Sequence, residues 1–135
     1  MTRINCIPPN ELHDKHLLAE YRELPRVFTL AYNAYLRGYK QTVHSYTMGA
    51  GHVKFFYDKL GYLAIRHIQL CNEMQKRGMT TNLANCHKEH RNKCIDDAIF
   101  ATYWNNWTPS ELDKHINRER INIRLAEMGA RNADK

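Results

Sequence analysis

The sequence lacks any long uninterrupted run of apolar residues. No stretch approaches the roughly 18 residues that a membrane-spanning helix needs, so no membrane partner is expected. The N-terminal stretch carries charges throughout and has no continuous apolar segment, unlike a secretory signal peptide. Cysteine is scarce, with only Cys6, Cys71, Cys86 and Cys94. Since nothing indicates export, we expect reduced thiols and a cytoplasmic protein, in the host cytoplasm if the source is viral.

Several motifs of catalysis are also missing. There is no Gly-x-Ser-x-Gly around a serine nucleophile, no cysteine in a recognisable activated setting, and no nucleotide-binding glycine loop. One short stretch, Gly49-Ala50-Gly51, precedes an expected helix and could hold a phosphate with its backbone N–H groups. Glycines of this kind more often let the chain turn, and both interpretations remain open at this point.

A cluster of metal-binding residue types does occur. Cys86, His87, His90 and Cys94 lie close together, and a spacing of four would put Cys86, His90 and Cys94 on one helical face. The spacing matches no standard zinc finger, and a fourth ligand is not evident. We therefore predict no metal site, and interpret the segment as a solvated helix with two half-buried cysteines.

Alternating strand patterns and internal repeats are absent, which favours an all-α fold. A chain of 135 residues fits a single domain, residues 1–135, and is long enough to bury an ordinary hydrophobic core. We expect one compact domain of three main helices, with long connecting loops and short extra helices. Residues 130–135 are expected to form a frayed tail.

Two of the main helices are predicted in the first 78 residues. Asn10 is a suitable N-cap for a helix over Glu11–Leu24. Pro25 then either ends this helix or opens a second segment that continues to Gly38. After a loop over 39–51, apolar residues at steps of three and four predict a long helix, His52–Arg77.

The face of that long helix can be assigned from its spacing. The apolar positions include Ile68 and should face the core, whereas Arg66 falls on the other side. A less periodic stretch predicts a further helix over Asn82–Tyr103. An aromatic connector, Tyr103-Trp104-Asn105-Asn106-Trp107, should follow it.

The third main helix has a clear start. Thr108 is a suitable cap, Pro109 fits the first position, and Glu111 completes a capping box. The helix should run to Met128 and end at Gly129.

Charge is unevenly distributed along the chain. Lys and Arg outnumber Asp and Glu by 20 to 14, which gives a net charge of +6 and a pI near 9.2. This balance is compatible with a polyanionic partner. Residues 29–78 carry seven Lys or Arg against two acids, whereas residues 1–28 are balanced, four against four. A local basic surface is therefore more informative than the total.

The balanced N-terminal stretch places its charges in a helical pattern. His16, Glu20 and Glu23 share one face, and Arg22 and Arg26 lie one turn apart on the neighbouring face. A carboxylate among arginines stays ionised, because opposite charge favours the charged form. From charge spacing alone, ordinary ion pairs on a solvated helix remain the preferred interpretation.

The same stretch resembles a known family. Thr2-Arg3-Ile4-Asn5, Glu11-Leu12, Asp14, His16-Leu17 and Ala19 to Phe28 closely resemble the N-terminus of phage endonuclease V-type enzymes, which are pyrimidine-dimer DNA glycosylases with AP-lyase activity. Gly49 to Leu60 and Lys76-Arg77-Gly78 are similar to later parts of that family. The match is dense over residues 2–28 and 49–78 and thins from residue 79.

The resemblance implies a mechanism. The nucleophile would be the α-amino group of Thr2, exposed once Met1 is removed. An α-amine has an ordinary pKa of about 7.7–8.0, against about 10.4 for lysine, so more of it is unprotonated at neutral pH. It would form a Schiff base at C1′ of the 5′ nucleotide of the dimer, and β-elimination would then cut the strand. Glu23 matches the family's catalytic carboxylate.

Further roles are implied for basic residues. Arg3, Arg22 and Arg26 match phosphate-binding positions that also orient Glu23, His16 lies beside them, and Arg120 and Arg124 align with basic phosphate contacts. The implied partner is double-stranded DNA containing pyrimidine dimers or abasic sites, bound by a monomer without a metal or organic cofactor.

Two departures keep an alternative open. The chain ends without the aromatic tail of the well-studied phage type, and Tyr103, Trp104 and Trp107 are expected to pack in the core or the connector instead. The alternative is a non-catalytic basic helical module that binds damaged or bent DNA. Only the enzyme requires the Thr2 amine and Glu23.

Overall fold

The computed structural model describes residues 3–81 and 88–133, and its regular structure is entirely helical. Three helices are long: α1 (Asp14–Leu36), α3 (Leu60–Lys76) and α5 (Glu111–Ala133). The short elements are α2 (His52–Phe55), α4 (Lys88–Asp96), and the 3₁₀ turns η1 (Pro9–Glu11), η2 (Phe56–Asp58) and η3 (Phe100–Tyr103). The predicted all-α fold with three main helices is confirmed. Among the described residues, none of the helices combines the length and apolar character needed to cross a membrane.

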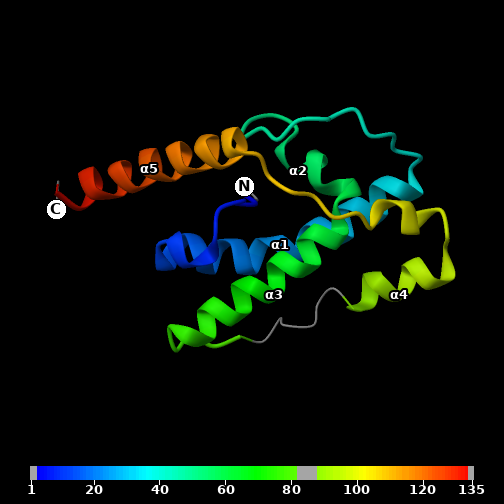
Figure 1. Cartoon of the computed structure of the whole chain (residues 1–135), viewed down its shortest axis with the longest axis horizontal. Coiled ribbons are helices and arrows are strands. Elements are labelled where there is room, and N and C mark those ends of the chain that lie inside the picture. The colour runs from blue at the N-terminus through cyan, green and yellow to red at the C-terminus, as the bar shows by residue number, and fades with distance from the viewer. Residues whose placement is uncertain (1–2, 82–87, 134–135) are drawn as a thin grey trace.

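The core forms where α1 and α3 cross (Figure 1). Both helices turn a stripe of apolar residues toward each other, and Leu17, Leu24, Leu63 and Leu70 are fully buried in it. Residues 3–8, called the N-terminal arm below, run between α1 and α5 (Figure 1). This placement brings the arm, α1 and the distant helix α5 together at one edge of the core.

The first helix differs from the prediction at both ends. It begins at Asp14 rather than Glu11, because residues Pro9–Glu11 form a 3₁₀ turn and His13 takes the N-cap position. It also continues through Pro25 to Leu36. A proline inside a helix removes one hydrogen bond and costs about 3 kcal/mol. Burial of Val27 and Phe28 beyond the proline offsets this cost, since each large apolar side chain contributes about 1.5–3 kcal/mol.

The predicted long helix over His52–Arg77 is wrong as a single element. It is divided into α2, η2 and α3, and Lys59 between them has non-helical angles, φ −127° and ψ 39°. The connector after η3 occupies this break. The Asn105 side-chain amide donates to the Asp58 carbonyl at 2.9 Å, and the Tyr62 N–H donates to the Asn105 carbonyl at 3.1 Å. Residues distant in sequence thus satisfy the backbone groups that the break exposes.

Gly61 permits this close approach, which gives a stability prediction. A Cβ added at Gly61 would lie 3.0 Å from the backbone oxygen of Asn105, so Gly61→Ala should destabilise the fold by about 1–3 kcal/mol. Gly129→Ala in α5 is the control, because its Cβ would meet nothing within 4 Å; it should stabilise by about 0.5–1 kcal/mol. Urea unfolding measures both, and equal effects would contradict the close contact.

The prediction for the buried face of α3 is wrong at two positions. Ile68 is 45% exposed, whereas Arg66 is only 3% exposed. The cause is Glu20 on α1, which faces Arg66 across the helix crossing and binds its guanidinium. A pattern of apolar spacing can place a charged residue beside the buried stripe, but it cannot show the partner on another helix that buries it.

The helix predicted over Asn82–Tyr103 is also interrupted. After α4, the Asp97 carboxylate accepts hydrogen bonds from the N–H groups of Ile99 and Phe100, at 3.0 and 3.1 Å, and starts the separate turn η3. The predicted packing of the aromatic connector is confirmed, since Trp107 contacts Tyr46, Phe55, Phe56 and Tyr62. Trp104 packs against Phe28.

The start of α5 lies two residues beyond the predicted capping box. The Asp113 N–H donates to Ser110 Oγ at 3.1 Å, and the Ser110 N–H donates to the Asp113 carboxylate at 2.9 Å. Ser110 and Asp113 therefore form the box predicted for Thr108 and Glu111. Gly129 does not end the helix, which continues to Ala133.

Candidate active site

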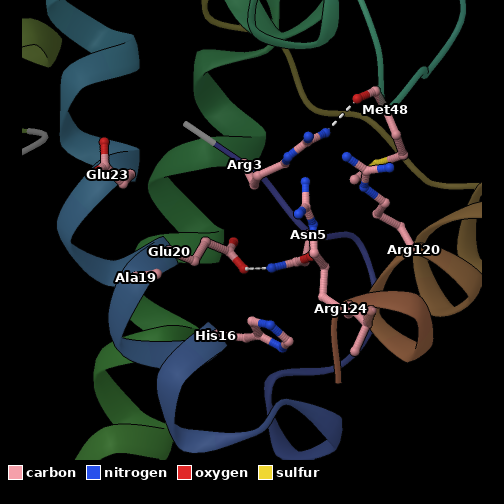
Figure 2. Close-up of a pocket in the computed structure, with 10 residues that line it drawn as sticks. Arg3, Asn5, His16, Ala19, Glu20, Glu23, Met48, Arg120 and Arg124 are labelled. Atoms are coloured by element: carbon pink, nitrogen blue, oxygen red, sulfur yellow. Dashed lines mark hydrogen bonds between the residues drawn. The ribbon is translucent and has the colours of Figure 1, made fainter. Parts of the chain in front are cut away.

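A pocket of about 320 Å³ lies between α1, the N-terminal arm and α5. Figure 2 shows Glu20 and Glu23 on α1 at one side, Arg120 and Arg124 on α5 at the other, and Arg3 and Asn5 of the arm between them. Five predicted site residues line it, namely Arg3, His16, Glu23, Arg120 and Arg124. The remaining lining residues are Asn5, Ala19, Glu20, Met48 and Ile121.

Three arginines make one side of the pocket strongly positive. The Arg3 guanidinium donates to the Met48 carbonyl, which fixes it at the rim. Burial, followed by repulsion from Arg120 and Arg124, lowers the pKa of Arg3, although an arginine stays charged at neutral pH. Arg120 Nε is buried and has no hydrogen-bond partner among the described residues. This crowding of cations favours a bound anion such as a phosphate.

Glu23 lines the same pocket from α1. Its side chain is 28% exposed and forms a 3.0 Å ion pair with Arg26, which is 70% exposed. Arg26 therefore reaches the pocket only through Glu23 and otherwise points to solvent. Arg22 is exposed and is not among the lining residues, so its predicted phosphate contact would lie outside the pocket. The helix thus presents its carboxylate to the pocket and two guanidinium groups to its outer side.

His16 lies one helical turn before Glu20 on the same side of α1 (Figure 2). Burial is the main cause that lowers the pKa of His16, and the charges of His13 and Arg124 lower it further. Its Nδ1 atom is buried without a hydrogen-bond partner in the described part of the chain. A neutral imidazole can both donate and accept a hydrogen bond, so His16 can serve a bound ligand in either way.

A buried ion pair supports the pocket from beneath. Arg66 Nε lies 2.8 Å from Glu20 Oε2, and Arg66 Nη2 lies 3.0 Å from Glu20 Oε1. Burial by itself would lower the pKa of Arg66, but the charge and hydrogen bonds of Glu20 raise it overall. Glu20 Oε1 also accepts a 2.8 Å hydrogen bond from Asn5. This carboxylate is fully engaged, which leaves Glu23 as the lining carboxylate that a ligand can reach.

His52 holds the arm from the other side. Its Nε2 accepts the Ile4 N–H at 2.8 Å, so its Nδ1 carries the proton and donates to the Thr47 carbonyl at 2.6 Å. Burial lowers the pKa of His52 and keeps it neutral, as this pair of hydrogen bonds requires. The Gly49–Gly51 stretch acts as a turn before α2, with Gly51 at φ +88°.

Sequence reasoning missed the support of the pocket. Asn5, Glu20, Arg66 and Asn117 were not predicted as site residues, yet all four are buried and hydrogen-bonded there. Asn5 and Glu20 line the pocket, whereas Arg66 and Asn117 support it from outside the lining. A usable signal was present for two of them. Glu20 follows Leu17 by three positions and Arg66 follows Leu63 by three, which places each charge beside a buried stripe.

Other predicted residues lie outside the described residues. Thr2 is one of them, and it is joined directly to Arg3 in the sequence. Cys86 and His87 are also outside, as is the side chain of His90, whereas Cys94 is buried in α4. Within the residues that the structure does describe, no group of three His, Cys, Asp or Glu side chains could hold a metal ion.

Comparison with protein families identifies the chain. The model of one family, described as pyrimidine dimer DNA glycosylase, matches residues 1–85. The match covers more than half of the 135 residues and includes the N-terminal arm, α1, α2 and α3. It therefore contains Arg3, His16 and Glu23, while α5 with Arg120 and Arg124 follows it. The chain belongs to the pyrimidine dimer DNA glycosylase family, whose activity is the repair of pyrimidine dimers in DNA.

Proposed function

We propose that this protein removes the 5′ base of a cyclobutane pyrimidine dimer through a Schiff base with Thr2, and then cuts the strand as an AP lyase. The observation that carries the proposal is the pocket, which Glu23 lines together with Arg3, Arg120 and Arg124. Arg3 is the residue that follows Thr2. The proposal therefore assigns the reaction to the pocket that Arg3 lines.

The first proposed step forms a bond between the Thr2 nitrogen and C1′ of the damaged nucleotide. The glycosidic bond breaks, its electron pair leaves with the base, and the nitrogen loses a proton. Opening of the sugar then breaks the C1′–O4′ bond, O4′ takes up a proton, and a C1′ iminium remains. Loss of a C2′ proton and departure of the 3′ phosphate complete the β-elimination. Each step moves electrons in pairs and consumes no redox partner.

Glu23 has two tasks in this proposal. Positive charge develops on the sugar as the glycosidic bond breaks, and a nearby carboxylate stabilises it. The same carboxylate can exchange the protons of ring opening and elimination. Its ion pair with Arg26 orients it from the solvent side at 3.0 Å. Glu20 cannot take over these tasks, because Arg66 and Asn5 occupy its oxygens.

The arginines would bind the DNA backbone. Arg3, Arg120 and Arg124 line one pocket, and in this proposal they hold a phosphate beside the damaged sugar. Arg22 and Arg26 extend the positive surface along the outer side of α1, where a duplex longer than the pocket would pass. The substrate that we propose is double-stranded DNA with pyrimidine dimers or abasic sites. The proposal also includes binding by one copy of the chain, in the cytoplasm and without a metal or organic cofactor.

Borohydride trapping tests the proposal. The processed protein is incubated with a dimer-containing duplex, sodium borohydride and a chelator, and the product is mapped by mass spectrometry. We expect a covalent adduct at Thr2, because borohydride reduces an imine to a stable amine. A matched protein with two extra residues before Thr2 is the control and should bind DNA without forming an adduct. If processed protein binds DNA but forms no adduct, the chain is a binding module.

A further inference from the structure

We propose that Asn117 on α5 is a positioning residue for the reaction, which acts through the N-terminal arm. The inference deepens the proposed function and rests on it, since it assigns to Asn117 the placement of the chain segment that carries the reacting amine. Asn117 lies outside the residues matched by the family model and does not line the pocket. Its role has to be inferred from what its side chain binds.

Every polar atom of the Asn117 side chain contacts the arm. Its Oδ1 accepts the Cys6 N–H at 2.7 Å and the Ile7 N–H at 3.3 Å. Its Nδ2 donates to the Asn5 side-chain oxygen at 2.8 Å. The residue is completely buried. The arm belongs to no helix or sheet, so Cys6 and Ile7 have no neighbouring strand to bind these N–H groups, and Asn117 supplies the missing acceptor.

These contacts belong to one buried hydrogen-bond network beneath the pocket. Asn117 binds Asn5, Asn5 donates to Glu20 at 2.8 Å, and Glu20 binds Arg66 through both carboxylate oxygens. Arg66 Nη1 then returns to the Ile7 carbonyl at 2.5 Å. The arm is thereby held between α5 on one side and α1 and α3 on the other. Each of these hydrogen bonds joins residues that are distant in sequence.

Stability accounts for only part of this arrangement. An apolar residue at position 117 would leave the buried Cys6 and Ile7 N–H groups without an acceptor, which lowers the stability of the fold. α5 is also attached by other contacts, namely buried Ile121 and the Arg118–Glu11 ion pair at 2.9 Å. What the amide adds is a fixed direction for residues 5–7, and hence for Arg3, which enters the pocket. Fixed geometry of this kind raises reaction rates, since a displacement of about 1 Å can lower a rate about 100-fold.

Asn117→Leu tests the inference with two readouts. Hydrogen exchange at the Cys6 and Ile7 amides should become faster, because their acceptor is lost. The single-turnover rate constant of borohydride trapping at saturating DNA should fall by about 10- to 100-fold. The dissociation constant for the duplex should change by less than about threefold, since Arg120 and Arg124 remain on α5. A rate constant reports only the folded molecules, so partial unfolding lowers the amplitude and not the rate.

Arg118→Ala is the matched control, because Arg118 also joins α5 to the N-terminal region but only at the surface. It should leave both readouts unchanged. If Asn117→Leu does not fold, Asn117→Asp replaces it; it lacks the donor for Asn5 and should also slow trapping. Unchanged amide exchange would overturn the anchor. Normal trapping by a loosened arm would overturn the positioning role, as would weaker DNA binding with a normal rate. If wild-type protein forms no adduct, the proposed function fails and the positioning role with it, whatever the exchange shows.

Discussion

Replacing Glu23 with glutamine is expected to remove strand cleavage while DNA binding persists. Glutamine keeps the shape of the side chain but neither carries the negative charge nor exchanges a proton. Loss of a general acid–base group lowers a rate by about 10²- to 10⁴-fold. Binding should persist because the cations of the pocket, Arg3, Arg120 and Arg124, are untouched. Single-turnover cleavage of a dimer-containing duplex measures the rate, and a mobility-shift assay measures binding.

Glu119→Gln provides the matched control for this experiment. Glu119 is an exposed carboxylate on α5 that pairs with His115 at 3.2 Å and does not line the pocket. The same chemical change there should leave cleavage at the wild-type rate. Release of Arg26 by Glu23→Gln has little effect on the fold, since Arg26 is largely in solvent. Cleavage by the Glu23 variant at the control rate would remove Glu23 from the mechanism.

The all-α fold class could be predicted from the sequence, but the positions where helices are interrupted could not. Amphipathic spacing identified three main helices because their buried stripes repeat every three or four residues. Pro25 was expected to interrupt α1, yet it lies within the helix because packing on both sides of it outweighs one lost hydrogen bond. The break at Lys59 was not expected, since Asn105 completes it from a later segment. Local sequence cannot predict a hydrogen bond to a residue that only the folded structure brings close.

The candidate site was predictable where the sequence resembles the family. Arg3, His16 and Glu23 came from the dense N-terminal resemblance, and the structure brings them together with Arg120 and Arg124. The residues beneath the pocket were missed for a physical reason. Each is polar, and a polar residue is predicted to be exposed when its hydrogen-bond partner is not known. Asn117 and Asn5 are far apart in the sequence, so no spacing rule connects them.

Replacing Arg66 is expected to lower the free energy of unfolding more than any other single substitution proposed above. Arg66→Met keeps most of the side-chain volume but leaves the Glu20 carboxylate buried without its cation. Both side chains of the pair are almost inaccessible, at 3% and 1% exposure. Loss of one partner of a buried ion pair typically costs about 3–5 kcal/mol, because the remaining charge is neither solvated nor compensated. The free energy of unfolding in urea should fall by that amount.

A second arginine–glutamate pair, Arg118 with Glu11, provides a matched control for Arg66→Met. Arg118 binds Glu11 through two nitrogens at 2.9 and 3.0 Å, with nearly the geometry of the Arg66–Glu20 pair, but in solvent. Arg118→Met should therefore leave the unfolding midpoint almost unchanged.

The double variant Glu20→Leu with Arg66→Met should be more stable than Arg66→Met alone, because it removes the uncompensated charge. Recovery will be incomplete, since Asn5 and the Ile7 carbonyl also lose their partners. If the double variant is less stable than the single one, the uncompensated carboxylate is not what destabilises Arg66→Met.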